Sequence, residues 1–290
     1  MSYDYIKFGY DSISNTALGP TNTSGAGLQD RFGVIKKIIL YGYLLNMTPV
    51  IPSVVLNGKH QIHKKNKISN LSEYYDYSRL KINGNKFNVV TDIGEIDETR
   101  VLNINYFNGH TVLGFDHTIQ GSSRKTQRGI LDEFPKLNFF LPFNKSVIYN
   151  SEKIISKYFS GSYSSLHIRR GDKLNVAGDE HRNHLSKVMY DEMTRVENVK
   201  KTLRKKSITG DVFVMTDMTD ADEALSDYRN KSDEFNFIFT NDITELKNIK
   251  INDNYLLWVT ERQVARSGLC NNRITMDHIK DEYTNRYGDV

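Results

Sequence analysis

Residues 163–173 read Y-S-S-L-H-I-R-R-G-D-K, and they predict a strand that ends in a charged turn. Apolar and small polar residues are interleaved as far as Ile168, a pattern typical of a short β-strand. Two arginines and a glycine follow, which predicts a turn at the carboxyl end of that strand. In α/β sheets this edge is where ligands bind. The stretch therefore predicts a ligand site in an α/β protein.

Arg169 and Arg170 are neighbours in this turn, and neighbouring side chains of an extended segment point in opposite directions. One arginine can hold an anion with its forked guanidinium while the other pairs with an acid and braces the turn. Asp172 is the nearest acid and is therefore the expected brace. The alternative is an ion pair in a solvent-exposed turn, which would contribute little to stability or function.

Residues 167–173, H-I-R-R-G-D-K, resemble the H-x-R-R-x-D-K signature of the GDP-fucose-dependent fucosyltransferases, the superfamily of α1,2-, α1,6- and protein O-fucosyltransferases. The resemblance implies a GT-B architecture, in which two Rossmann-like α/β domains face a cleft. It also implies inverting transfer from a GDP-sugar without a metal or another cofactor. In the family, the arginine that matches Arg169 holds the donor diphosphate. The other residues that the resemblance assigns to the donor site are His167, Arg170, Asp172 and Lys173.

Composition describes a globular protein of 290 residues, 38% hydrophobic and 26% charged, which suits two domains. A net charge of +4 suits a small anionic ligand and provides no broad basic surface for nucleic acid. The single cysteine, Cys270, excludes an intramolecular disulfide and fits a reducing compartment. We find no signal-peptide pattern and no apolar run approaching the roughly 18 residues of a membrane span, so we expect a cytoplasmic protein.

The first half of the chain predicts a strand, a glycine-containing loop and a helix. Residues 5–10 predict the strand, and apolar positions between residues 32 and 45 recur at helical spacing. Such a loop aims backbone N–H groups at an anion. Residues 27–31, G-L-Q-D-R, resemble the loop that opens the family's first domain, and residues 48–52 resemble the strand that follows. The resemblance places Gly27, Gln29 and Arg31 at the donor site.

Asp30 departs from the family, which has asparagine at this position, and Gln29 stands where a small residue is usual. Because an acid repels a diphosphate, we expect Asp30 to contact the acceptor or to pair with Arg31. Inverting transfer also needs a general base on the acceptor hydroxyl. The α1,6-type relatives have a glutamate a few residues past the motif, where this chain has Ala177. The candidate bases are Asp30, Asp179 and Glu180.

The second half alternates strands and helices, as a nucleotide-binding domain requires. We place the domain boundary at a Gly-Ser turn, so that residues 1–160 form an acceptor-side domain and residues 161–290 a donor-side domain. Thr216 and Asp217 resemble the T-D that ends a family strand, whose acid lies near the base or ribose of the nucleotide. The expected helices are 144–159 and 184–206, and the expected strands are 211–216 and 235–239.

The family's serine-rich phosphate turn, S-x-F-S, is missing from this sequence. The residues that can supply the same donors are Ser267, Gly268, Asn271, Asn272 and Thr275. This departure leaves GDP-rhamnose or another GDP-hexose as an alternative donor to GDP-fucose. A non-catalytic nucleotide or glycan binder is the alternative from another class.

Two further segments concern the acceptor, which we expect to be an oligosaccharide or a glycoprotein glycan. Residues 71–80 resemble an acidic-aromatic segment of the family's first domain. Residues 105–142 are irregular and predict an acceptor-binding region. We expect no metal site there, since its His110, Asp116 and His117 are more typical of a surface loop.

Overall fold

The computed structural model describes residues 3–8, 28–51, 54–55, 68–69, 71–91, 94, 96–104, 133–170, 174, 187–218, 221–230, 234–269 and 273–287. The chain forms two compact units. Unit 1 comprises Met1–Val147 and Lys250–Val259, and unit 2 comprises Ile148–Ile249 and Thr260–Val290. The boundary expected after residue 160 follows helix α4 (Lys145–Tyr158), whereas this division falls within the first turn of that helix.

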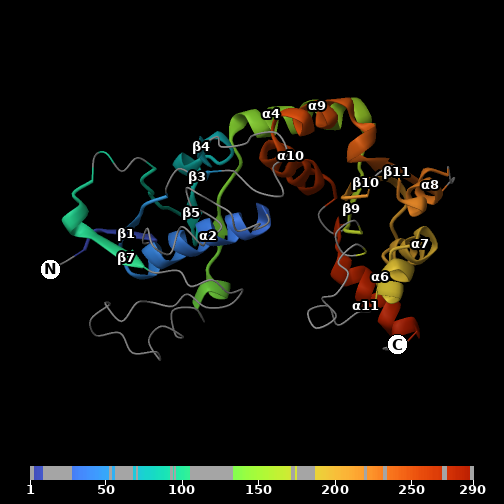
Figure 1. The fold of residues 1–290 in the computed structure, drawn as a ribbon, viewed down its shortest axis with the longest axis horizontal. Coiled ribbons are helices and arrows are strands. Elements are labelled where there is room, and N and C mark those ends of the chain that lie inside the picture. Colours follow the sequence, from blue (N-terminus) through green and yellow to red (C-terminus); the bar gives the residue numbers. More distant parts are fainter. Residues whose placement is uncertain are drawn as a thin grey trace. The chain divides into compact units, whose positions relative to one another are not determined.

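Unit 2 is built on a four-stranded sheet in the order β11-β10-β9-β12. Figure 1 labels three of these strands, β9, β10 and β11. All neighbouring strands in it are parallel. In chain order the sheet reads third, second, first, fourth, which is the arrangement of half a doubly wound nucleotide-binding fold. The strands are β9 (Ser164–Ile168), β10 (Gly210–Thr216), β11 (Phe235–Phe239) and β12 (Arg273–Ile274).

One face of this sheet is covered by helices whose apolar side chains form a single core with the strands. Leu166, Val214 and Leu203 are representative members, and each is completely buried. Burying side chains of this size stabilises a fold by about 1.5–3 kcal/mol each, so this core holds the strand ends in place. The helices on this face are α6 (Lys187–Met193), α7 (Val196–Lys205), α8 (Glu223–Arg229) and α11 (Met276–Tyr287).

Phe213 points away from that core and makes an edge-to-face contact with Phe159, which directly follows α4. Lys157 and Tyr158 bond the carboxylate of Glu245 in α9 (Thr244–Asn252), at 2.8 and 2.9 Å. The pair of helices α4 and α9 lies side by side in Figure 1. Helix α10 (Asn254–Ser267) contributes its first residues to unit 1 and the remainder to unit 2.

The single helix predicted over residues 184–206 is wrong, because the described part of this segment forms α6 and α7 with a break at Thr194 and Arg195. Thr194 is completely buried. Its hydroxyl donates to the Tyr190 carbonyl at 2.8 Å, and its own carbonyl accepts from the hydroxyl of Tyr228 at 2.7 Å. The break therefore has a tertiary cause that helical periodicity does not reveal.

Unit 1 contains a three-stranded parallel sheet in the order β2-β1-β7. Helix α2 (Leu28–Leu44) lies between β1 and β2 in the chain, which confirms the predicted strand, helix and strand. The predicted glycine loop lies outside the described residues. The strands of this sheet are β1 (Tyr5–Phe8), β2 (Thr48–Pro49) and β7 (Val101–Ile104). Antiparallel pairing joins β3 (Val54–Val55) with β4 (Ile68–Ser69), and β5 (Lys81–Ile82) with β6 (Asn85–Lys86) and β8 (Phe139–Phe140).

Close contact between α2 and β2 depends on Gly42. A Cβ atom at this position would lie 2.5 Å from Cγ of Pro49 and 2.8 Å from the carbonyl oxygen of Met47. Such distances are far inside normal van der Waals contact, so only glycine fits without movement of the surrounding backbone. Gly33 lies on the same helix, and a Cβ atom there would meet no other part of the described structure within 4 Å.

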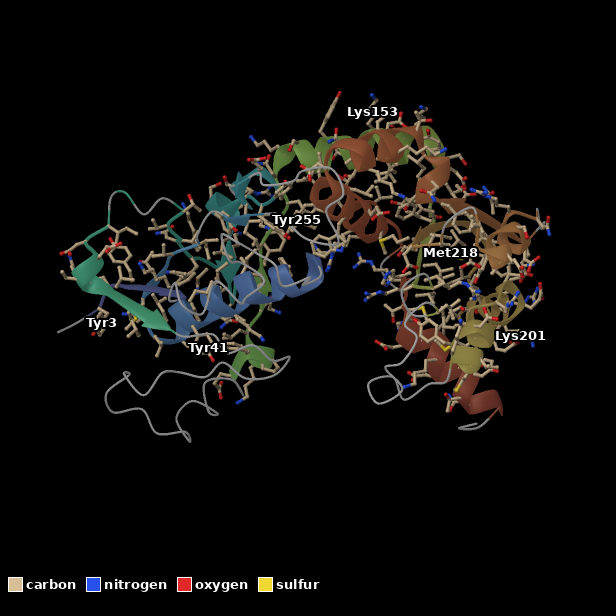
Figure 2. All side chains as sticks on the ribbon, in the orientation of Figure 1. Tyr3, Tyr41, Lys153, Lys201, Met218 and Tyr255 are labelled. Atoms are coloured by element: carbon tan, nitrogen blue, oxygen red, sulfur yellow. The ribbon has the colours of Figure 1, made fainter. Side chains whose placement is uncertain are left out.

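A group of buried tyrosines completes the core of unit 1. The Tyr74 hydroxyl donates to Oδ2 of Asp253 at 3.0 Å, and the hydroxyls of Tyr75 and Tyr255 lie 2.9 Å apart. Asp253 also accepts the backbone N–H groups of Tyr255 and Leu256 and so caps α10. Tyr255, labelled in Figure 2, thus belongs to a late segment of the chain that completes the first unit.

Candidate functional site

The carboxyl ends of the four parallel strands of unit 2 share one edge of the sheet. From β9 the chain continues to β10 and β11 on one side, and β12 lies on the other side of β9. Ligands of open α/β sheets bind at such a reversal of strand order, outside the carboxyl ends of the strands. The residues that directly follow these strands are Arg169 after β9, Asp217 after β10 and Thr275 after β12.

Arg169 is exposed at this edge, next to the exposed side chain of His167. Desolvation by the surrounding chain lowers the pKa of His167 below its ordinary value, and the positive charge of Arg169 lowers it further. Arg262 of α10 acts in the same direction, while Asp217 opposes it. His167 is therefore neutral at pH 7. It can donate and accept hydrogen bonds at the site while the positive charge is supplied by arginine.

Arg170 has the opposite environment, since its side chain is only 3% exposed. Its Nε donates to Oδ2 of Asp222 at 3.0 Å, and one terminal nitrogen donates to the Thr194 hydroxyl at 2.6 Å. The other terminal nitrogen bonds a carboxylate oxygen of Asp191. These partners come from α6, from the break after α6 and from the residue that caps α8. Arg170 therefore connects the strand end to two crossover segments of the sheet.

The electrostatics of this group, which we call the Arg170 brace (Arg170, Asp191, Thr194 and Asp222), are balanced. Burial alone would lower the pKa of Arg170, but the hydrogen bonds to Asp222 and Asp191 raise it above its ordinary value. Burial alone would raise the pKa of Asp191, but bonds from Arg195 and Arg170 lower it. Both Arg170 and Asp191 therefore stay charged at neutral pH. The guanidinium of Arg170 is thereby committed to the protein. Asp172, the brace expected from the sequence, lies outside the described residues.

The backbone of the turn is fixed as well. The N–H of Arg170 donates to Oδ1 of Asp217 at 2.6 Å, so the end of β10 holds the end of β9. The Thr216 hydroxyl accepts the N–H of Met218 at 3.1 Å. Leu174 donates its N–H to the carbonyl of Arg170 at 2.8 Å. Thr216 and Asp217 thus lie at the predicted edge, and their contact with a nucleoside remains a prediction.

Ser267 and Gly268 lie at the other end of β9. The N–H of Leu269 donates to the carbonyl of Tyr163 at 2.9 Å, and a Cβ on Gly268 would lie 2.8 Å from that same oxygen. Tyr163 directly precedes β9, so these residues belong to the amino edge of the sheet, opposite Arg169. A phosphate held by Arg169 is out of their reach, because a strand advances by about 3.3 Å per residue.

Thr275, unlike Ser267 and Gly268, lies on the same edge of the sheet as Arg169. It follows β12 at the carboxyl edge and directly precedes α11. Its N–H donates to Nδ1 of His278 at 3.1 Å, which is one half of the reciprocal capping of a helix start, and its hydroxyl lies 3.1 Å from the same nitrogen. The positive end of the α11 dipole is thus on the same edge of the sheet as Arg169.

The remaining predicted residues fall elsewhere. Gly27, Asp172, Lys173, Asp179 and Glu180 lie outside the described residues, as do Asn271 and Asn272 and the expected acceptor region's His110, Asp116 and His117. Gln29, Asp30 and Arg31 belong to the first turn of α2 in unit 1, where only the backbone is described. Across the described ranges, no group of three or more His, Cys, Asp or Glu side chains is arranged to hold a metal ion.

Sequence reasoning missed the acids of the Arg170 brace and also Arg262. Asp191 and Asp222 are 21 and 52 residues away from Arg170 in the chain. Asp222 has one local signal, because it precedes α8 and caps it by accepting the N–H of Ala224 at 3.0 Å. That signal predicts a helix start and gives no indication of an arginine partner.

Comparison with known proteins finds similarity in fold alone. No protein-family model and no curated protein sequence matches the chain. A crystal structure of POFUT1 in complex with GDP-fucose aligns with a TM-score of 0.47 and 13% identity, over 95% of this chain and 98% of that chain. A crystal structure of POFUT1 in complex with GDP aligns with a TM-score of 0.46 and 12% identity, over 95% and 99%.

The predicted α/β class is confirmed, with parallel sheets and flanking helices. No helix of the described part is long and apolar enough to cross a membrane.

Proposed function

We propose that the chain is a glycosyltransferase of GT-B architecture that transfers fucose from GDP-fucose to a hydroxyl group of a glycan, with inversion. The observation that carries the proposal is the pair of arginines after β9. Arg170 is buried in its brace, and Arg169 is exposed at the reversal of strand order, where α/β sheets bind nucleotides. The resemblance of residues 167–173 to the fucosyltransferase signature assigns the diphosphate to Arg169.

The proposed chemistry needs negative charge to be stabilised as GDP leaves. The acceptor oxygen attacks the anomeric carbon, the bond to the β-phosphate oxygen breaks, and the acceptor proton passes to a base. Arg169 would bind the departing diphosphate through its guanidinium fork. The start of α11 at Thr275 would add its dipole, and neutral His167 would supply a hydrogen bond.

Arg170 acts in this proposal as a positioning residue. Its guanidinium is bonded to the protein, and its N–H holds the Asp217 carboxylate. Arg170 therefore fixes the position of the backbone that carries the Arg169 side chain. Asp217 is proposed to lie near the nucleoside, and the general base is proposed to be Asp30, Asp179 or Glu180.

The first test is a calorimetric titration of the purified protein with GDP, UDP and GDP-fucose, with and without EDTA. The proposal expects GDP and GDP-fucose to bind, UDP not to bind, and EDTA to have no effect. If GDP binds and GDP-fucose does not, the donor is another GDP-hexose such as GDP-rhamnose. Failure of GDP to bind overturns the proposal.

A matched pair of variants tests Arg169. Arg169→Ala should lower GDP affinity by roughly tenfold to a hundredfold, since hydrogen bonds to charged groups contribute about 1.5–3 kcal/mol. Arg204→Ala is the control, because Arg204 pairs with Glu234 beside Gly210, at the amino edge of the same sheet. Equal GDP affinity in Arg169→Ala and Arg204→Ala would show that Arg169 does not bind GDP.

The alternative from another class is a nucleotide or glycan binder without catalysis. It is favoured by Ala177, which stands where the α1,6-type relatives have glutamate. Asp30→Asn, Asp179→Asn and Glu180→Gln should separate the two functions. Loss of a general base typically lowers turnover by about a hundredfold or more without abolishing donor binding. Bound GDP-fucose without any sugar release to a panel of glycans would establish the binder.

A further inference from the structure

The side chains of β9 alternate between the two faces of the unit 2 sheet. Leu166 and Ile168 belong to the core that the strands form with α6, α7, α8 and α11. Arg170 points to that same side, since its guanidinium bonds α6 and the residue that caps α8. Because neighbouring residues of an extended segment point to opposite sides, His167 and Arg169 face the other side of the sheet.

Helix α10 packs on this second face. Phe213 of β10 points to it and contacts Phe159, and Tyr163 stacks on the same ring with the centroids 4.0 Å apart. The hydroxyl of Tyr163 donates to the carbonyl of Val264 in α10 at 2.5 Å. The N–H of Leu269, just after the helix, donates to the Tyr163 carbonyl at 2.9 Å. Because Tyr163 directly precedes β9, α10 ends at the amino edge of the sheet.

The part of α10 that belongs to unit 2 starts at the opposite edge. The hydroxyl of Thr240, which directly follows β11, donates to Oε1 of Glu261 at 2.5 Å. Glu261 is therefore held at the carboxyl edge of the sheet. Arg262 is the next residue of the helix, and its side chain is half-buried. Helix α10 thus brings a second arginine to the same face and the same edge as Arg169.

The electrostatics of this edge agree with that placement. Burial lowers the pKa of His167, and the positive charges of Arg169 and Arg262 lower it further, whereas Asp217 acts in the opposite direction. Oδ1 of Asp217 also accepts the N–H of Arg170 at 2.6 Å. Two cations that act on one neutral imidazole also repel each other, and an anion between them removes that cost. A positive potential of this kind at a ligand-binding edge favours anions.

Two guanidinium groups on different elements suit an anion with two adjacent phosphates. One fork bonds the oxygens of one phosphoryl group, and the second cation stabilises the charge of its neighbour. We propose that Arg262 is a second phosphate-binding residue, which together with Arg169 holds a diphosphate between α10 and the end of β9. It would supply charge where the chain lacks the serine-rich turn of the fucosyltransferases. That this diphosphate belongs to GDP rests on the proposed function, whereas diphosphate binding does not.

The test is titration calorimetry of the full chain with two probes, inorganic pyrophosphate and GDP. Arg262→Gln removes the charge and keeps most of the length of the side chain. It should weaken the binding of both probes by about tenfold, the loss expected for one contact to a charged group. Arg262→Lys keeps a positive charge without the fork, and its loss should be smaller than that of Arg262→Gln.

The matched control is Arg266→Gln. Arg266 is an exposed arginine one turn further along α10, toward the amino edge of the sheet. This variant should bind both probes as the wild type does. The inference is overturned if Arg262→Gln keeps wild-type affinity for both probes, or if Arg266→Gln loses as much. Thermal unfolding identifies a loss caused by misfolding, in which case Arg262→Lys decides.

A second measurement tests the position of Arg262 without any ligand. NMR of the imidazole C–H groups gives the pKa of His167. This pKa should rise in Arg262→Gln, because a positive charge that lowers it has been removed, and it should not change in Arg266→Gln. An unchanged pKa of His167 in Arg262→Gln would place Arg262 away from the site and overturn the inference.

The two probes separate this inference from the proposed function. If GDP binds and Arg262→Gln does not weaken its binding, only the role of Arg262 fails. If pyrophosphate binding depends on Arg262 and GDP does not bind, the inference stands and the proposed function fails. If neither probe binds to the wild-type protein, both fail.

Discussion

Unit 1 and unit 2 both contain a parallel sheet, but they present different chemistry. In unit 2, β9, β10 and β11 have five to seven residues, and a charged residue directly follows both β9 and β10. In unit 1, β2 has only two residues, and residues 71–80 consist of 3-10 turns and buried tyrosines. A regular sheet edge is suited to an anion, because backbone and arginine donors converge there.

The largest expected effect is the loss of the Arg170 brace. Arg170→Ala leaves Asp191 and Asp222 without their central partner, which typically destabilises a protein by about 3–5 kcal/mol. Since chains of two units often unfold in more than one step, the measurement is hydrogen exchange resolved to peptides. Exchange should accelerate in β9 and β10, while the peptides of unit 1 keep their protection.

The control for this prediction is Arg195→Ala. Arg195 also pairs with Asp191, but its side chain is 38% exposed, so the cost should stay below about 1 kcal/mol. Equal acceleration of hydrogen exchange in Arg170→Ala and Arg195→Ala would mean that the burial of Arg170 does not increase its contribution to stability.

The second effect concerns the packing of unit 1. Gly42→Ala should destabilise this unit by about 1–3 kcal/mol, because the new methyl group would overlap Pro49 and the Met47 carbonyl. Gly33→Ala on the same helix has open space and should be neutral or stabilising by about 0.4–1 kcal/mol. Fluorescence of Trp258, the single tryptophan, reports on this unit during urea unfolding. A Gly42→Ala midpoint equal to that of Gly33→Ala would contradict the tight contact between α2 and β2.

A smaller effect on GDP binding is expected when residue 169 keeps a positive charge but loses the forked guanidinium group. Arg169→Lys should weaken GDP binding by about tenfold, which is about 1.4 kcal/mol, because a lysine cannot bond a diphosphate in a bidentate way. The loss should be smaller than in Arg169→Ala, and the unfolding of unit 2 should not change. Titration calorimetry distinguishes the two variants, and wild-type affinity in Arg169→Lys would show that charge alone suffices.

The smallest effect is a pH dependence that His167 should give to unit 2. Because the folded-state pKa of His167 lies below the unfolded value of about 6.5, the unfolded chain takes up a proton first as pH falls. The stabilising contribution of His167 is therefore complete above that value and declines as pH falls from about 6.5 toward the folded pKa. His167→Asn should flatten this slope, as measured by hydrogen exchange of β9 at several pH values. An unchanged slope of stability against pH in His167→Asn would show that other titrating groups cause the pH dependence.

The regular parts of unit 2 can be predicted from the sequence, whereas its brace cannot. Strands β10 and β11 are predicted to within one residue, because buried parallel strands have nearly continuous apolar sequences. The turn after β9 and the opposite environments of its two arginines also follow from local reasoning. The partners of Arg170 do not, since Asp191 and Asp222 become neighbours only when α6 and α8 pack onto the sheet.

Two errors have the same physical origin. The break at Thr194 is stabilised by Arg170 and Tyr228, which are distant in the chain, so helical periodicity continues through it. Ser267 and Gly268 have the residue types of a phosphate turn, and only the register of β9 and β12 shows that they lie at the amino edge. In both cases residue type suggests a role and tertiary placement decides it.

The tyrosine contacts that complete unit 1 have a consequence for how the chain is synthesised. Tyr74 and Tyr75 find their partners 179 and 180 residues later, in the segment Lys250–Val259. Every member of the Arg170 brace, by contrast, lies between residues 170 and 222. A ribosome makes the chain from its N-terminus, so unit 1 is begun first but is completed only after most of unit 2 has emerged. A fragment that stops at Val147 would therefore carry an unfinished tyrosine core and depend on chaperones or on the missing segment supplied as a peptide.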